Sequence, residues 1–485
     1  MGKLNIIKKY RELPIQVRAS FWFLICSFLQ KGISSITTPI FTRLLNTAEY
    51  GQFNVFNSWL GIASIFITMS LSGGVYTQGL IKFDKERYTF SSSLQGLVLT
   101  LTCIWTVIYL IFHDFWNNLF SLTTVQMLAL LIMAWTSEVF CFWAAEQRVR
   151  LNYVKLVIVT LIVSVAKPVI GIIFVINAED KVTARILGLA LVELIGYFGL
   201  FISQMLRGKK FFSARYWKYA IMFNLPLIPH YLSQTVLSSS DRIMIKNMVG
   251  ESEAGIYSLA YSVSLIMTLF NTALGYTLSP WIYQKIKENK IKDIEPISYI
   301  SLAVIAFANI MLIAFAPEVI LIFAPKSYYE AIWVIPPIAM SVYFMFAYDL
   351  FSKFEFYYEK TKFIMLASLI ASVTNVILNY IFINLFGYMA AGYTTLLCYF
   401  LYALFHFIFM RRICKKQSES MTPFNLKTVA GITGVFITVG FIYILTYKIT
   451  IVRYIISLAI VSLTIVKWRK IFELIRKTYI NKNIK

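Results

Sequence analysis

Charged residues are scarce in this chain, and so are the residue types from which catalytic and metal-binding sites are built. Asp, Glu, Lys and Arg make up 14% of the 485 residues, and there are three histidines and five cysteines. The cysteines form no CxxC pair, which argues against a zinc site or a disulfide framework. No Walker-type phosphate-binding loop occurs, so we expect no ATP hydrolysis. We likewise expect no cofactor, no metal and no enzymatic activity.

Hydrophobic residues are abundant instead, at 59% of the chain with a mean hydropathy of +0.70. A soluble domain of this length would need more polar surface, whereas a membrane-spanning helix needs about 20 mostly apolar residues. The sequence predicts fourteen such helices and hence an all-α membrane protein. We place them near residues 19–41, 54–75, 91–112, 123–145, 156–176, 184–206, 219–239, 255–277, 297–316, 331–350, 363–384, 389–410, 428–447 and 452–468.

Lysines and arginines are distributed unevenly between the two ends of these spans. With the N-terminus inside, 35 of the 45 Lys and Arg residues fall in inner segments and eight in outer segments. The remaining two, Lys31 and Lys167, lie within spans. This positive-inside bias predicts a multi-pass protein with both termini in the cytoplasm. The net charge of +22 suits anionic lipid head groups, and we expect no nucleic-acid partner.

A short sequence pattern occurs twice, after the first and after the seventh span. Each copy has an arginine, a short outer connection and then Glu-x-Gly-x-(Phe/Tyr), which begins at Glu49 and again 204 residues later at Glu253. Because six spans separate the copies, we expect two six-helix lobes in the same orientation, as in parallel-repeat transporters. The predicted parts are an N-terminal lobe at 1–206, a C-terminal lobe at 207–410, and two further helices with a basic tail at 411–485. We interpret the two carboxylates as helix N-terminal caps.

Several motifs, taken in order, resemble those of a known family. They are Thr38-Pro39-Ile40-Phe41-Thr42-Arg43-Leu44-Leu45, Glu49-Tyr50-Gly51, Asp241-Arg242 and Gly255-Ile256-Tyr257. Over essentially its whole length the chain is similar to bacterial polysaccharide-repeat-unit flippases of the multidrug/oligosaccharidyl-lipid/polysaccharide exporter superfamily.

The resemblance implies a flippase of the bacterial plasma (inner) membrane. Its substrate would be an undecaprenyl-pyrophosphate-linked oligosaccharide, moved from the cytoplasmic to the outer leaflet by alternating access. The product would serve O-antigen, capsule or a related polysaccharide. The implied partners are the lipid-linked oligosaccharide, membrane lipids, and a glycan polymerase with its chain-length regulator.

A pyrophosphate and a sugar chain require a path with positive charge and hydrogen-bonding groups. Lys31 lies about 12 residues into the first span, near the membrane midplane, and Ser27, Ser34 and Thr38 share its helical face. An intramembrane lysine is costly on a lipid-facing surface. We therefore interpret these four residues as a substrate-binding stripe, with a buried, internally satisfied lysine as the alternative.

The second intramembrane lysine, Lys167, has two acids at comparable depth. Counted from the ends of the predicted spans, Glu138 and Glu193 both lie within a few ångströms of its axial level, so either could pair with it. The cluster is interpreted as a structural ion pair, a proton- or cation-coupling site, or a direct substrate contact.

Three residues interrupt the seventh span. Pro226 and Pro229 free backbone carbonyls and permit a bend, so we expect a hinge there. Broken helices often lie at transporter binding sites. His230 is therefore either a substrate-binding residue or a side chain fixed by a neighbouring helix.

Two other functions remain open at this point. A cation-coupled multidrug extruder would have a more apolar cavity, with acidic residues in place of the midplane lysine. A membrane glycan polymerase would need a larger outer loop and would form covalent products. Neither the glycan nor the energy source follows from the sequence.

Overall fold

The computed structural model describes residues 14–417 and 423–479, and within them it contains helices and no strands. The predicted all-α fold is therefore confirmed. The chain divides into two compact units, Met1–Lys246 and Asn247–Lys485, each described below by itself. Eleven helices in the described part are long and apolar enough to cross a membrane. The count of fourteen and the lobe boundaries at 206 and 410 stay predictions.

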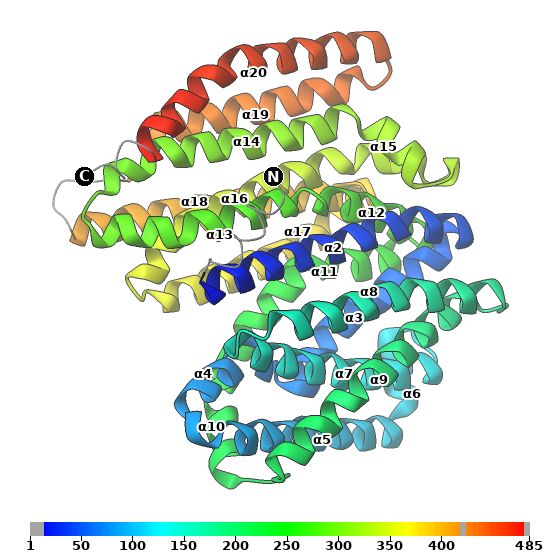
Figure 1. Ribbon diagram of the computed structural model, residues 1–485. Coiled ribbons are helices and arrows are strands. Elements are labelled where there is room, and N and C mark those ends of the chain that lie inside the picture. Colours follow the sequence, from blue (N-terminus) through cyan, green and yellow to red (C-terminus); the bar gives the residue numbers. More distant parts are fainter. Residues whose placement is uncertain (1–13, 418–422, 480–485) are drawn as a thin grey trace, which may run out of the picture. The chain divides into compact units, whose positions relative to one another are not determined.

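The first unit contains ten α-helices and three short 3-10 helices in its described part (Figure 1). The predicted spans 2 and 7 are each interrupted, and α11 ends at the boundary between the units. The α-helices are α2 (Ile15–Leu44), α3 (Thr47–Thr68), α4 (Val75–Lys82), α5 (Arg87–Ile111), α6 (His113–Phe120), α7 (Thr124–Val149), α8 (Tyr153–Ile176), α9 (Lys181–Gly208), α10 (Ala214–Asn224) and α11 (Ile228–Met248), and the 3-10 helices are η1 (Leu71–Gly73), η2 (Asp84–Glu86) and η3 (Leu225–Leu227).

The second unit is organised around one largely buried helix, α16, which packs against α12, α13, α14 and α18. Helices α19 and α20, in orange and red in Figure 1, lie beside α14. The elements are α12 (Glu251–Leu265), α13 (Thr268–Lys287), η4 (Ile291–Asp293), α14 (Ile294–Ala314), α15 (Ala316–Phe323), η5 (Lys326–Trp333), α16 (Ile335–Tyr357), α17 (Thr361–Phe386), α18 (Ala390–Gln417), α19 (Leu426–Thr446) and α20 (Thr450–Tyr479).

Aromatic side chains form much of the core of the first unit. The ring of Tyr76 stacks on Phe142, with centroids 4.2 Å apart, and on Phe90 at 5.8 Å. The approach of Phe90 requires a glycine opposite it, since a Cβ at Gly79 would lie 2.1 Å from the ring. Packing of this density leaves little tolerance for added atoms.

A capping box begins α3. The Asn46 side chain accepts a hydrogen bond from the Glu49 amide at 2.9 Å, and the Glu49 carboxylate accepts one from the Asn46 amide at 2.8 Å. These two bonds satisfy amide groups that the helix itself leaves without acceptors. The interpretation of Glu49 as a helix cap is confirmed.

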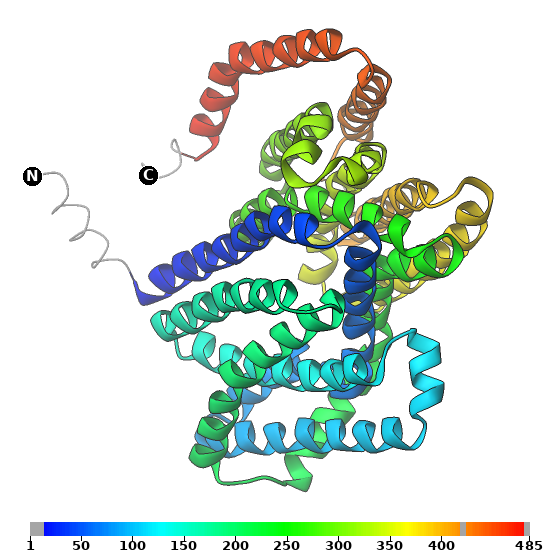
Figure 2. The ribbon, with the colours of Figure 1, turned by 90° about the vertical axis from the view of Figure 1, so that its right-hand side faces the viewer.

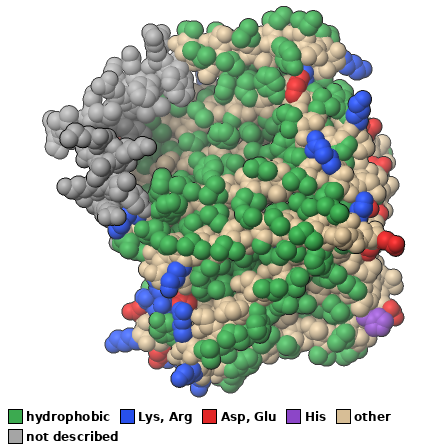
Figure 3. All heavy atoms as spheres, turned by 45° about the vertical axis from the view of Figure 1, so that its right-hand side comes forward, with side chains coloured by type: hydrophobic (Ala, Val, Ile, Leu, Met, Phe, Trp, Pro, Cys, Tyr) green, Lys and Arg blue, Asp and Glu red, His purple; other side chains and the backbone are tan. Residues whose placement is uncertain are grey.

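Large hydrophobic side chains cover the outside of both units. On α8 an apolar stripe at helical spacing has exposed fractions near one half: Ile158, Ile162, Val165, Val169 and Ile173. Figure 3 shows hydrophobic side chains over most of the visible face, with charged ones gathered toward its margins. Exposed apolar surface of this extent requires a non-aqueous environment. Together with the eleven apolar helices, it identifies a multi-pass membrane protein.

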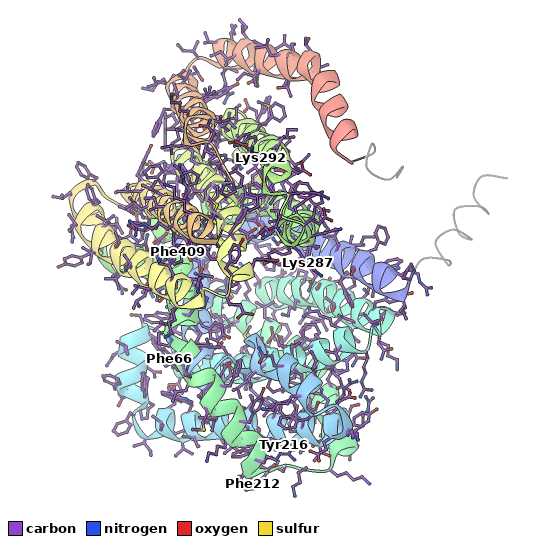
Figure 4. The ribbon with its side chains drawn as sticks, turned by 90° about the vertical axis from the view of Figure 1, so that its left-hand side faces the viewer. Phe66, Phe212, Tyr216, Lys287, Lys292 and Phe409 are labelled. Atoms are coloured by element: carbon purple, nitrogen blue, oxygen red, sulfur yellow. The ribbon has the colours of Figure 1, made fainter. Side chains whose placement is uncertain are left out.

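The connections between helices are short. Figure 2 shows α6 joining the ends of α5 and α7. Lys287 and Lys292, labelled in Figure 4, flank the turn between α13 and α14, one of the segments predicted to lie inside. No described connection is long enough to house a separate soluble domain.

Candidate functional site

The predicted polar stripe lies on α2 in the first unit. Lys31 is 13 residues from the end of this helix at Leu44, roughly 20 Å along its axis. Lys31 and Ser34 are exposed, while Ser27 and Thr38 are half-buried. The hydroxyl of Ser27 donates to the Phe23 carbonyl at 3.0 Å, and that of Thr38 donates to the Ser34 carbonyl at 2.9 Å. The stripe thus places a cation and hydroxyls at mid-helix, outside the core of its own unit.

The structure brings Lys167 together with Glu193. The Lys167 ammonium lies 2.6 Å from Oε1 of Glu193, whose side chain is 4% exposed. The other carboxylate oxygen accepts hydrogen bonds from Thr136 at 2.9 Å and Ser137 at 3.3 Å. Both oxygens of this buried carboxylate are satisfied, and these contacts link α7, α8 and α9.

Glu138 lies apart from that pair, although it is also buried on α7. Its two carboxylate oxygens accept hydrogen bonds from Ser72, one from the amide at 2.6 Å and one from the hydroxyl at 3.0 Å. Among the described residues, no lysine, arginine or histidine forms an ion pair with it. Glu138 is therefore a buried acid with two local hydrogen-bond donors from Ser72.

Ser72 belongs to a break in the second predicted span, between α3 and α4. Met69 and Ser70 have φ angles of 53° and 46°, the left-handed region that ends a helix. A Cβ at Gly73 would lie 3.0 Å from the hydroxyl of Tyr231, which packs over the break. Glu138 and Tyr231 thus hold the interruption from two sides.

The seventh predicted span is broken as well. Pro226 lies in η3, while Pro229 and His230 lie in the first turn of α11. At the end of α10, the Asn224 side chain donates to the carbonyls of Met69 and Ser70. One interrupted span therefore hydrogen-bonds directly to the other, next to Ser72 and Glu138.

Several buried polar residues were missing from the sequence-based candidates. In the first unit, the Gln204 amide donates to Glu146 at 2.8 Å and accepts from Gln95 at 2.6 Å. In the second unit, Glu355 of α16 and His406 of α18 form a fully buried pair. Within the described residues, no group of three or more His, Cys, Asp or Glu side chains is placed to hold a metal ion.

The chain is similar to known proteins in family, in sequence and in structure. A family model described as "Polysaccharide biosynthesis protein" matches residues 17–285, and a model named MatE matches residues 226–381. An uncharacterized membrane protein of Haemophilus influenzae is 23% identical over 373 residues, which is 74% of this chain and 88% of that protein.

Two solved structures share the fold. The lipid II flippase MurJ, in an inward closed conformation, has a TM-score of 0.69 at 16% identity and covers 92% of this chain and 99% of its own. An inward-facing multidrug resistance MATE family transporter of the MOP superfamily has a TM-score of 0.61 at 14% identity, covering 80% of this chain and 96% of its own.

Proposed function

The chain belongs to the family of polysaccharide biosynthesis proteins, within the multidrug/oligosaccharidyl-lipid/polysaccharide exporter superfamily, and from that premise we propose that it is a lipid-linked oligosaccharide flippase. Its substrate is an undecaprenyl-pyrophosphate-linked repeat unit, carried from the cytoplasmic to the outer leaflet by alternating access. The repeat unit serves O-antigen, capsule or a related polysaccharide. The protein acts as a transporter of the bacterial inner membrane, with both termini in the cytoplasm.

The observation that carries this proposal is the position of Lys31. An exposed cation near the middle of an apolar helix is unfavourable against hydrocarbon, so it belongs in a water-filled or ligand-filled path. A pyrophosphate supplies the opposite charge. Ser27, Ser34 and Thr38 on the same face supply hydroxyls for the phosphate or the first sugar, while a polyprenyl tail needs no polar partner.

The broken spans are the moving parts in this proposal. Pro226 and Pro229 interrupt the backbone next to His230, which we place at the substrate path. Glu138 is the coupling acid, because its carboxylate has no cationic partner among the described residues and can take up a proton without breaking an ion pair. Lys167 and Glu193 keep the first unit together instead. A glycan polymerase and its chain-length regulator would act on the product.

One experiment tests the role of Lys31. Lys31→Ala should abolish glycan export while the amount of protein in the membrane stays normal, and Lys31→Arg should retain part of the export. Lys155→Ala is a matched control, since Lys155 is exposed at the inner end of α8. Full export by Lys31→Ala would exclude this role, and loss of the protein itself would point to a structural lysine.

A multidrug extruder is the second candidate, favoured by the MatE match at residues 226–381. It would export cationic dyes, and replacing Lys31 by alanine would leave that activity intact because a cationic substrate gains nothing from the ammonium. Dye efflux and glycan export measured on the same variants distinguish the two functions.

A further inference from the structure

The second unit contains a titratable pair that the proposed transport path does not use. Glu355 and His406 are both fully buried, and Nδ1 of His406 lies 2.8 Å from Oε1 of Glu355. They join α16 to α18, which pack closely along their length. Phe409, labelled on α18 in Figure 4, lies one turn beyond His406 and stacks on Phe363 of α17.

The surroundings of the pair are aromatic, and among the described residues no third group forms an ion pair with Glu355 or His406. Ring centroids of Tyr402, Tyr348 and Phe363 lie 4.6, 5.9 and 5.9 Å from that of His406. The nearest charges on α16 neutralise each other, since Lys353 binds Asp349 at 2.7 Å. Other titratable groups on the helices packed here include Tyr399, Arg411 and Cys414 on α18 and Lys362 at the start of α17. On the remaining helices they include Tyr283 of α13, which lies against Tyr357, and Tyr299 of α14, which hydrogen-bonds to Glu295.

Each member of the pair keeps one buried polar atom without a hydrogen-bond partner in the described residues. These atoms are Oε2 of Glu355 and Nε2 of His406. The contrast with Glu193 is direct, because both oxygens of Glu193 are satisfied. Buried polar groups are usually satisfied in full, so these two atoms are exceptions to the general pattern.

The pair also lies close to the end of its helix. Glu355 is two residues before the last residue of α16, about 3 Å along the axis. The turn that follows contains Glu359 with a φ of 57°, and the Lys360 amide donates to the Glu355 carbonyl at 2.8 Å. Opening this single turn would expose Glu355 and His406 to water on the side that is predicted to be cytoplasmic.

We propose that Glu355 and His406 form a proton-binding site of the second unit, which takes up one proton when the end of α16 closes over it and releases that proton when it opens. Sealed from water, the pair must be close to neutral overall, because an uncompensated buried charge is strongly unfavourable. A neutral pair holds one proton. We place this proton on Nδ1 of His406, which then donates it to Oε1 of Glu355 across 2.8 Å.

In water near neutral pH the same two groups hold less than one proton, since free glutamate is ionised and free histidine is mostly neutral there. Closure therefore binds a proton and opening returns it to the same aqueous side. Acidic conditions favour the closed arrangement and alkaline conditions the open one. This conclusion goes beyond the proposed function, because it holds for any substrate the protein carries.

Histidine-selective nitrogen NMR of the full chain in nanodiscs tests the site without any substrate. The chain has three histidines, and the signal lost in His406→Gln assigns the residue. At about pH 7, where a free imidazole would be largely neutral, wild-type His406 should be an imidazolium. Glu355→Gln should convert it to a neutral imidazole, whereas Glu359→Gln, which removes an exposed carboxylate four residues further along the chain, should leave it charged.

If Glu355→Gln does not fold, a pH titration of the wild-type protein tests the proton-binding site instead. Between about pH 5 and about pH 8 the His406 signal should pass from imidazolium to neutral while circular dichroism shows the protein still folded. A neutral His406 at about pH 7 that ignores Glu355→Gln, or one state throughout the titration, would overturn the proposal. A failed flippase assay would leave these readings unaffected, so the two proposals fail separately.

Discussion

Removing either member of the Lys167–Glu193 pair should destabilise the first unit, and by different amounts. The Glu193 side chain is 4% exposed and that of Lys167 is 31% exposed. After Lys167→Met, a nearly sealed carboxylate keeps only the hydroxyls of Thr136 and Ser137. After Glu193→Gln, the partly exposed ammonium can move on its flexible stem. Lys167→Met should therefore be the more damaging change.

Typical magnitudes set the scale of these effects. Leaving one charge of a buried pair without its partner costs about 3–5 kcal/mol, which we expect for Lys167→Met, with a smaller loss for Glu193→Gln. The double variant has no buried charge at this place and should recover most of the loss. The coupling energy of the two changes should then be at least about 2 kcal/mol.

Reversible unfolding of the purified protein in mixed micelles, followed by circular dichroism, gives the four free energies of this cycle. Lys167→Met combined with Glu138→Gln is the matched control, because Glu138 is bonded to Ser72 and not to the lysine. The effects of these two changes on the free energy of unfolding should be additive within about 0.5 kcal/mol. Additive effects for Lys167 and Glu193, or equal coupling of Lys167 to both acids, would refute the reasoning.

Three further predictions concern packing, coupling and topology. Gly96→Ala should destabilise the protein by about 1–3 kcal/mol, because the new Cβ would lie 2.2 Å from the Phe211 carbonyl oxygen. Gly199→Ala should not destabilise it, because nothing lies within 4 Å of the new Cβ. Thermal unfolding of both variants measures the difference. Glu138→Gln should flatten the pH dependence of transport in proteoliposomes while substrate binding persists, and an unchanged pH profile would exclude proton coupling through Glu138. Reporter fusions after Lys485 and at Asn117 should give opposite signals, and equal signals would contradict the predicted orientation.

Much of the fold follows from hydropathy alone. Helices such as α5, α8 and α9 lie within a few residues of their predicted spans, because a long apolar segment can satisfy its backbone in a membrane only as a helix. The break between α3 and α4 was missed, since a window of about 20 residues averages over it. Ser70-Leu71-Ser72-Gly73-Gly74 is a turn-rich sequence that would have indicated it.

The sequence indicates candidate polar residues within the spans, but it does not give their pairings. Counting residues along helices gives axial depth, which made Glu138 and Glu193 equivalent partners for Lys167. Which acid faces the lysine depends on helix rotation and on which helices are neighbours, and the structure selects Glu193. Glu355 was missed because the predicted tenth span ended at residue 350, whereas α16 continues to Tyr357.

The central claim is tested most directly by leaflet-resolved movement of a lipid-linked oligosaccharide. Proteoliposomes containing the purified protein and a polyprenyl-pyrophosphate-linked oligosaccharide are probed with a membrane-impermeant lectin. The amount of lectin bound over time measures the glycan exposed on the outer leaflet. The wild type should transfer the glycan between leaflets, Lys31→Ala should not, and Lys155→Ala should behave as the wild type. Equal glycan exposure in protein-free vesicles and in wild-type vesicles, together with efflux of cationic dyes by the wild type, would contradict the account and identify a drug extruder instead.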